Sequence, residues 1–158
     1  MSADLRPYTP ADAGGLARIF HDAIRIGAAA HYTEAERRAW APVCPSADAW
    51  RARLIGLWTL VAHGPDGPSG FMSLRPDGYL DLAFVAPDRA GQGVGSALLH
   101  ATETHARATA IPRLTTQASL AARGFFLRHG WLETAPQTVE RGGVKLRNFR
   151  MEKWLTQA

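Results

Sequence analysis

The spacing of hydrophobic residues divides the chain into regions of different predicted structure. In the first third, apolar residues recur three or four positions apart, at Leu16, Ile19, Phe20, Ala23 and Ile24. This spacing predicts a helix, preceded by a short strand, with Thr9 as its cap and Pro10 in its first position. Residues 33–40 and 46–55 predict two further helices, each opened by a Thr or Ser cap.

The period then shortens to two, which predicts β-strands. Residues 58–63 and 71–74 are two such segments, joined by a stretch rich in Gly and Pro. The clearest strand is YLDLAFV, residues 79–85. Strict alternation places its residues on two faces, with Leu80, Leu82 and Phe84 on one and Tyr79, Asp81, Ala83 and Val85 on the other.

A glycine-rich loop and a second alternation of elements follow. We expect a helix of about a dozen residues from Gly95 or Ser96, a strand at 113–118, a helix at 119–130 and a late strand at 144–155. The order strand, loop, helix, strand predicts a right-handed crossover between parallel strands within a mixed sheet. The 158 residues therefore predict an α/β fold with a mixed sheet, in a single domain spanning 1–158.

Composition narrows the class of protein. Hydrophobic residues make up 46% and charged residues 20%, as in ordinary globular domains, and no apolar stretch is long enough to span a membrane. The single cysteine excludes a disulfide within the chain, so we expect a cytoplasmic protein. Eighteen basic against fourteen acidic residues give a net charge of +4, but the arginines are scattered. Scattered charge argues against nucleic acid and suits a small polyanionic ligand.

The loop between the 79–85 strand and the next helix carries Gly91, Gly93 and Gly95 on alternate positions. Such glycines allow positive φ angles or a close approach to the backbone. At a helix N-terminus, unpaired N–H groups and the helix dipole create an anion site, and phosphate is the usual occupant. The dinucleotide pattern fails because its third glycine would fall on Ser96 or Leu98, and the loop has no lysine for a P-loop. A ligand-free loop is the alternative.

Two segments together resemble the GNAT superfamily of N-acetyltransferases. Residues 85–99, VAPDRAGQGVGSALL, are similar to its cofactor loop V-x-P-x-x-R-G-x-G-I-G-x-x-L-L, and SLAARGFFLRHGW resembles N-x-x-A-x-x-F-Y-x-x-x-G-F. The resemblance extends from about Gly70 to Trp154. It implies a single-domain acyltransferase fold, with a splayed central sheet flanked by helices, that uses acetyl-CoA as co-substrate and no metal.

The resemblance also assigns cofactor-binding residues. Backbone N–H groups of the loop would bind the coenzyme A pyrophosphate; the loop residues concerned are Gly91, Gln92, Gly93, Val94, Gly95 and Ser96. Phe84 and Val85 would lie where their strand diverges from its neighbour and would bind the pantetheine arm. The backbone N–H of Val85 would polarise the acetyl carbonyl. Ser119 stands where the family often has a coenzyme-contacting Asn.

Two positions depart from the family pattern. Ala90 replaces the usual Arg or Gln, and Arg89, one residue earlier, could supply the charge from a shifted position. Phe126 replaces the Tyr that protonates the departing thiolate in many members, so this residue can line the coenzyme site but leaves the general acid without a candidate.

Asp81 is the leading candidate for the general base. It interrupts an apolar strand, and period-two alternation places it beside Val85 on one face. A carboxylate partly removed from water suits this role. The alternative is a structural Asp held by a neighbouring Arg or by the backbone. Secondary candidates are Glu34, Glu36 and His31, and no metal-binding His spacing occurs.

The predicted activity is transfer of an acetyl group from acetyl-CoA to an amine by direct attack. The acceptor would be a small-molecule amine or a peptide, which the sequence does not identify, and a homodimer is left open. A non-catalytic acyl-CoA sensor with the same fold is the alternative, because the Tyr is missing at Phe126. Nucleic-acid binding is a third hypothesis, prompted only by the basic charge.

Overall fold

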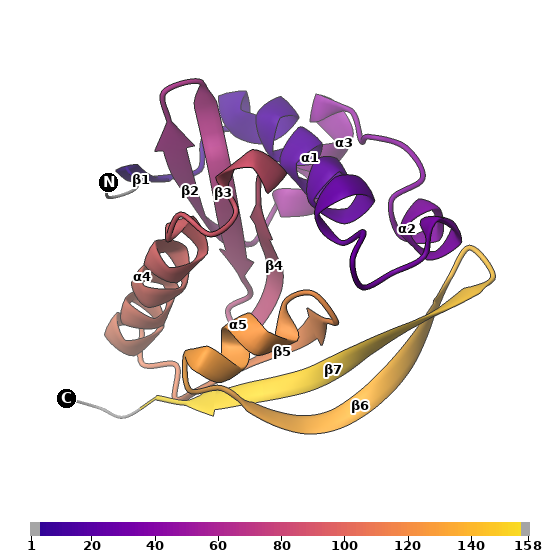
Figure 1. Cartoon of the computed structure of the whole chain (residues 1–158). Helices are drawn as coiled ribbons and strands as arrows, with labels where there is room; N and C mark the ends of the chain where they lie inside the picture. Colours follow the sequence, from indigo (N-terminus) through magenta and orange to yellow (C-terminus); the bar gives the residue numbers. More distant parts are fainter. Residues whose placement is uncertain (1–3, 156–158) are drawn as a thin grey trace.

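The computed structural model describes residues 4–155, which form an open mixed sheet of seven strands (Figure 1). In sheet order the strands are β1 (Asp4–Pro7), β2 (Trp58–Gly64), β3 (Gly67–Leu74), β4 (Tyr79–Val85), β5 (Arg113–Ser119), β7 (Val144–Trp154) and β6 (Leu132–Arg141). Neighbouring strands are antiparallel except β4 and β5, which are parallel. The predicted mixed α/β sheet with a crossover is confirmed.

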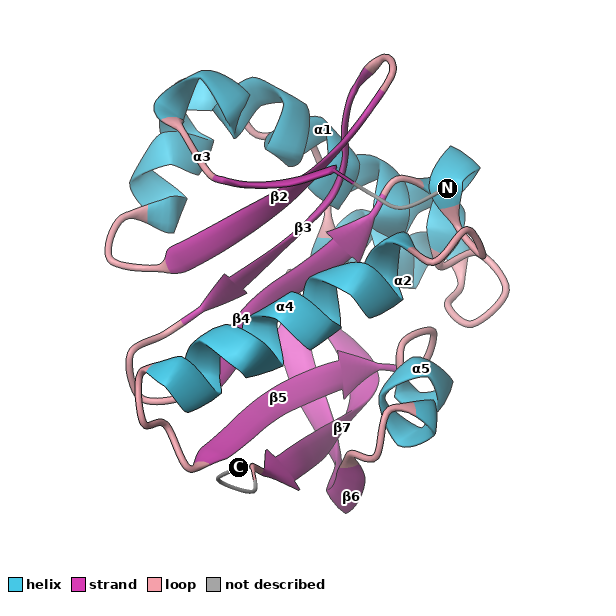
Figure 2. Ribbon diagram, turned by 90° about the vertical axis from the view of Figure 1, so that its left-hand side faces the viewer, coloured by secondary structure: helices cyan, strands magenta, loops and turns pink. Residues whose placement is uncertain are grey.

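Helices cover both faces of this sheet (Figure 2). The helices are α1 (Ala13–Asp22), α2 (Glu34–Trp40), α3 (Ala47–Leu54), α4 (Val94–Ala108) and α5 (Arg123–Arg128). The predicted caps of α2 and α3 are confirmed: Thr33 Oγ1 accepts from the Glu36 N–H at 3.1 Å, and Ser46 Oγ from the Ala49 N–H at 3.1 Å. In the described part of the chain, no helix is both long and apolar enough to cross a membrane.

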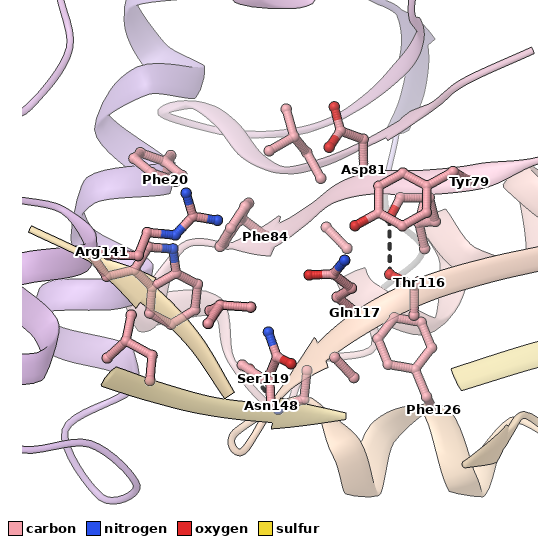
Figure 3. A pocket seen from close by; sticks show the side chains of 18 of the residues that line it. Phe20, Tyr79, Asp81, Phe84, Thr116, Gln117, Ser119, Phe126, Arg141 and Asn148 are labelled. Atoms are coloured by element: carbon pink, nitrogen blue, oxygen red, sulfur yellow. Dashed lines mark hydrogen bonds between the residues drawn. The ribbon is translucent and has the colours of Figure 1, made fainter. Parts of the chain in front are cut away.

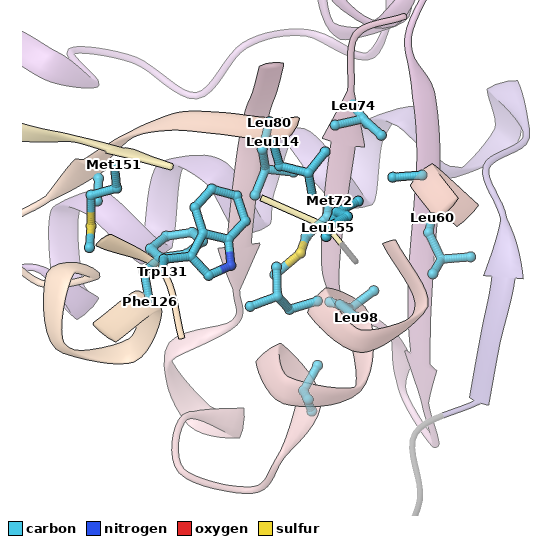
Figure 4. Close-up of a cluster of buried hydrophobic side chains, with 14 of the residues drawn as sticks. Leu60, Met72, Leu74, Leu80, Leu98, Leu114, Phe126, Trp131, Met151 and Leu155 are labelled. Atoms are coloured by element: carbon cyan, nitrogen blue, oxygen red, sulfur yellow. The ribbon is translucent and has the colours of Figure 1, made fainter. Parts of the chain in front are cut away.

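Each face of the sheet has its own hydrophobic core. The cluster under α4 and α5 includes Leu60, Met72, Leu98 and Trp131 (Figure 4). The cluster under α1 and α3 includes Leu16, Trp50, Val61 and Phe71. Because Leu60 and Val61 point to opposite clusters, β2 follows the expected alternation. Both faces of the central strands are buried, which makes this sheet a rigid base for the loops at its ends.

The predicted faces of β4 are wrong because of a β-bulge at Asp81. Ser73 pairs with Leu82 and Leu74 pairs with Leu80, so Asp81 is an extra residue opposite β3. A bulge resets the alternation of side chains. As a result Leu80 joins the α4 side, whereas Leu82 joins the α1 side.

The same bulge corrects the expected relation between Asp81 and Val85. Val85 packs against the cluster under α4, whereas the Asp81 carboxylate contacts Arg53 of α3, on the other side of the sheet. The two side chains therefore do not share a face, although both residues belong to β4.

Two predicted helices change in extent, and one strand was not predicted. The predicted helix 119–130 is only α5, because β5 continues through Ser119 and a turn follows. The helix after the glycine loop begins at Val94, slightly earlier than expected, and runs for 15 residues. The sequence analysis missed β6, a largely polar segment that contains Pro136. This strand lies at the sheet edge, where a proline is tolerated because it need not donate to a second neighbour.

Candidate functional site

A gap opens in the sheet between β4 and β5. The two strands pair only at Tyr79–Thr115 and Leu80–Thr116. The Thr116 hydroxyl donates to the Leu80 carbonyl at 2.8 Å at the point where pairing ends. Beyond it the strands diverge around a cavity of about 260 Å³ (Figure 3). The expected splay of the central sheet is confirmed.

The cavity is walled by segments far apart in the sequence. The wall is formed by the two diverging strands, by aromatic residues of α1, α2 and α3, by α5, and by the β6–β7 hairpin. Its lining includes Phe20, Tyr32, Trp50, Tyr79, Asp81, Phe84, Gln117, Ser119, Phe126, Arg141 and Asn148. The hairpin (yellow in Figure 1) reaches α2, where an added Cβ at Gly142 would lie 3.9 Å from the Ala39 carbonyl. This contact places the hairpin end beside the cavity.

The backbone of β4 directs donors into the gap. The Ala86 N–H donates to the Ser69 carbonyl of β3 at 2.8 Å. In an antiparallel pair, hydrogen-bonded and non-hydrogen-bonded positions alternate. The N–H of Phe84 therefore faces β3, whereas the N–H groups of Ala83 and Val85 face the side where β5 has diverged.

The glycine loop forms the N-terminal end of α4. Gly91 and Gly93 have φ angles of +77° and +84°, with open space where a side chain would be. The first helical hydrogen bond there runs from the Ala97 N–H to the Gly93 carbonyl. The N–H groups of residues 94–96 consequently have no partner within the helix and carry the positive end of its dipole.

The loop contacts α5, which connects it to the cavity wall. An added Cβ at Gly95 would lie 3.2 Å from the Phe125 ring. Ser96 Oγ lies 3.0 Å from His129 Nε2, and His129 Nδ1 lies 2.8 Å from the Phe125 carbonyl. Most of the predicted site residues thus fall into two neighbouring places: residues 91–96 at the start of α4, and Asp81, Phe84, Ser119 and Phe126 around the cavity. Val85 is the exception, because its side chain packs under α4 and does not line the cavity.

Comparison with known proteins identifies the family of the chain. The sequence model of a family described as the acetyltransferase (GNAT) domain matches residues 28–153. The chain belongs to the GNAT acetyltransferase family. A curated relative is named "uncharacterized N-acetyltransferase YafP", from Escherichia coli K12. It is 35% identical over 147 residues, which are 93% of each chain.

Solved GNAT structures show the same fold. A GCN5-related N-acetyltransferase from Rhodopseudomonas palustris has a TM-score of 0.92 and 37% identity, covering 98% of this chain and 97% of that one. The PaiA N-acetyltransferase of Thermoplasma acidophilum, solved in complex with coenzyme A, has a TM-score of 0.77 and 17% identity, covering 98% of this chain and 100% of that one. At that lower identity, the likeness concerns the fold alone.

Asp81 lines the cavity but is held in an ion pair. Its side chain is 9% exposed, and its carboxylate accepts from Arg53 Nη1 at 2.8 Å and lies 3.8 Å from Arg75 Nη2. The ion pair is what the structural alternative predicts, and the place at the cavity is what a base requires. Mutation of Asp81 and of Arg53 would distinguish the two interpretations.

The sequence analysis overlooked Tyr79, whose hydroxyl points into the cavity (Figure 3). Burial raises its pKa and the Asp81 charge adds to this, while the guanidinium groups of Arg75, Arg141 and Arg53 partly oppose it. Tyr79 is therefore a neutral hydroxyl at neutral pH. Its position two residues before Asp81, as the first residue of the same predicted strand, was the available signal.

The other cavity tyrosine has an occupied hydroxyl. Tyr32 donates to the Arg147 carbonyl at 2.6 Å and accepts from the Leu120 N–H at 2.9 Å. Burial raises the pKa of Tyr32 as well. Its two hydrogen bonds join the α1–α2 connection to β7 and the end of β5, so Tyr32 fixes the cavity wall.

Ser119 and Arg89 are two residues to which the GNAT resemblance assigned contacts with coenzyme A. Ser119 lines the cavity, and its hydroxyl accepts from the Ala122 N–H at 3.0 Å just before α5. Arg89 lies against Gly64 of the β2–β3 hairpin, with its guanidinium 3.9 Å from Asp66.

Across residues 4–155, no three His, Cys, Asp or Glu side chains gather as a metal site requires.

Proposed function

We propose that the protein transfers an acetyl group from acetyl-CoA to an amine by direct attack. The observation that carries this proposal is the divergence of β4 from β5 after Leu80, next to the glycine loop at the head of α4. A chain-like thioester can lie along the exposed edge of β4 while its phosphates bind the loop. Family membership supports the same reaction.

The loop is suited to the pyrophosphate of coenzyme A. Its N–H groups at residues 92–96 and the dipole of the 15-residue helix α4 favour an anion. Positive φ at Gly91 and Gly93 shapes the loop without side chains that would fill the approach. The pantetheine arm would then pair with β4 at Ala83 and Val85, whose N–H groups face the gap. We propose the Val85 N–H as the donor that polarises the acetyl carbonyl.

The chemistry requires a neutral amine. An alkylammonium has a pKa of about 10.4 and must lose a proton before its nitrogen can attack. We propose that Asp81 accepts this proton, directly or through water. The nitrogen then bonds to the acetyl carbon, the carbon–sulfur bond breaks, and the sulfur leaves with the electron pair. The nitrogen loses its second proton to water, which gives the neutral amide.

Since position 126 has no hydroxyl, we propose that the thiolate receives its proton from Tyr79. Of the three tyrosines, Tyr8 does not line the cavity and the Tyr32 hydroxyl is already bonded. The raised pKa of Tyr79 keeps its hydroxyl protonated and available as a donor. A thiol has a pKa of about 8.5, so its anion is a tolerable leaving group and the expected contribution is modest.

Exchanging the two aromatic positions tests this proton donor. We expect Tyr79→Phe to lower kcat by about tenfold, less than is usual for acid catalysis because the thiolate leaves readily. Phe126→Tyr alone should be tolerated, with activity unchanged or a few-fold higher, and should restore kcat in the double variant. The rate at which free thiol is released gives kcat for the wild type, the two single variants and the double variant. Full activity of Tyr79→Phe would instead assign the proton to water or to the acceptor nitrogen.

The coenzyme site can be tested without knowing the acceptor. Coenzyme A and acetyl-CoA should raise the melting temperature, because a ligand that binds only the folded state stabilises it, whereas NAD should do much less. Gly93→Val should abolish this response. A matched control is Gly56→Val, since Gly56 has φ +82° and the same open surroundings but lies between α3 and β2.

Both valine variants carry the same backbone strain, so both should melt earlier than the wild type. Only Gly93→Val should lose the coenzyme A shift. Equal stabilisation by NAD, or none by coenzyme A, would contradict the proposed function. An acyl-CoA sensor, the alternative from the sequence, would bind acetyl-CoA tightly and yield no product with any amine.

A further inference from the structure

The cavity between β4 and β5, where an acceptor amine would meet Asp81, carries excess positive charge. Its lining holds three guanidinium groups, of Arg53, Arg141 and Arg147, against the single carboxylate of Asp81. That carboxylate is already paired with Arg53 at 2.8 Å, and Arg75 lies 3.8 Å away. An acceptor that brings only positive charge therefore enters an unfavourable field, whereas one with a compensating negative group does not.

Arg141 is the guanidinium best placed to meet such a group. It is the last residue of β6, at the turn of the hairpin that reaches α2. In Figure 3 its side chain extends toward the part of the cavity between Phe20 and Phe84. Within residues 4–155 no carboxylate lies within ion-pair distance of Arg141. Its charge is thus available to a ligand.

Two further lining residues have polar atoms with no partner. Trp50 is 4% exposed, and neither its indole N–H nor Asn148 Oδ1 forms a hydrogen bond with the described part of the chain. Both residues line the cavity. Buried polar atoms nearly always have a partner. These two atoms are enclosed within the cavity wall, so the group that the cavity itself offers to an anionic oxygen of a small molecule is the Arg141 guanidinium.

We infer that the acceptor is an amine that also bears a carboxylate or a phosphonate, and that Arg141 binds this anionic group. The inference rests on the acetyl transfer proposed above. A guanidinium presents two parallel N–H groups that fit such oxygens in pairs. With the anion at Arg141, the amine is directed to the part of the cavity that Asp81 lines, where its proton can be removed.

Matched pairs of acceptors test this inference. Acetylation is measured for phenylalanine against phenylalaninamide, for 2-aminoethylphosphonate against ethanolamine, and for putrescine as a dication. We expect kcat/KM to be at least about tenfold higher for the anionic member of each pair, as one charge-assisted contact predicts. The amide is the weaker base and has more free amine at neutral pH, so a preference for the acid reports on the site.

Substitutions of Arg141 test whether this residue causes the preference for anionic acceptors. Arg141→Gln should reduce it to less than about threefold, through KM of the acceptor, and leave KM of acetyl-CoA unchanged. Arg141→Lys should keep part of it. The control Arg18→Gln removes an exposed guanidinium of α1, outside the cavity, and should keep all of it. Equal rates within the pairs, faster acetylation of putrescine, or an unchanged preference in Arg141→Gln would overturn the inference while leaving the acetyl transfer intact.

A binding measurement separates this inference from the proposed function. N-acetylphenylalanine and N-acetylphenylalaninamide are titrated calorimetrically into coenzyme A-saturated protein. Tighter binding of the acid, lost in Arg141→Gln, supports the inference even if no tested amine is acetylated. Equal binding of the two compounds, or binding of neither, overturns it. Failure of the proposed function appears separately, either as absence of stabilisation by coenzyme A or as binding of acetyl-CoA without product from any amine.

Discussion

Asp81→Asn lowers kcat/KM for acetyl transfer by about 100-fold or more, if the carboxylate removes the proton of the amine. The amide retains the size of the side chain and one oxygen for Arg53, which donates to it at 2.8 Å in the wild type. Stabilisation by acetyl-CoA should change little. The rate of the variant should rise toward high pH, where the free amine no longer needs a base.

Two further variants separate a base from a structural carboxylate. Arg53→Met removes the ion pair and leaves the carboxylate, so activity should fall by less than about tenfold if Asp81 is the base. Asp66→Asn, on an exposed turn residue, controls for the loss of a charge. If Arg53→Met is as inactive as Asp81→Asn, or if Asp81→Asn is folded and fully active, Asp81 has a structural role.

Glu103→Ala should lower the free energy of unfolding by about 3 kcal/mol, because it leaves a partly buried lysine without its counter-ion. Glu103 of α4 is 7% exposed. Its carboxylate accepts from Lys153 Nζ of β7 at 2.8 Å and from the Trp131 indole N–H at 3.1 Å. Lys153 also donates to the His129 carbonyl, just after α5, at 2.8 Å. The network joins α4, α5 and β7.

Thermal unfolding measures this effect. For a domain of this size, about 3 kcal/mol corresponds to a fall in Tm of roughly 6–12 °C. Glu103→Gln should have an intermediate effect, since its amide oxygen can still accept one hydrogen bond. Glu133→Ala breaks the more exposed pair with Arg123 and should cost less than about 1 kcal/mol. A Glu103→Ala variant that melts within about 2 °C of the wild type would show that the network adds little.

The sequence determined the features that depend on local chemistry. The loop glycines were predicted to adopt positive φ or to allow a close approach to the backbone, and Gly91 and Gly93 have positive φ. The caps Thr33 and Ser46 were predicted because their hydroxyls act within one helical turn. The crossover and the opening of the sheet beside Phe84 followed from the order of elements and the family resemblance.

Long-range packing decided the features that the sequence left open and those that were predicted wrongly from it. The bulge at Asp81 depends on its register with β3, so period-two alternation along β4 alone could not place that side chain. Strand β6 lacks a hydrophobic pattern because it pairs with β7 at the edge of the sheet. The same hairpin brings Arg141 to the cavity that Tyr79 also lines, across 62 positions of sequence, by packing against α2. Local propensity carries no information about such contacts, because they form only when distant segments are brought together by burial of the shared core.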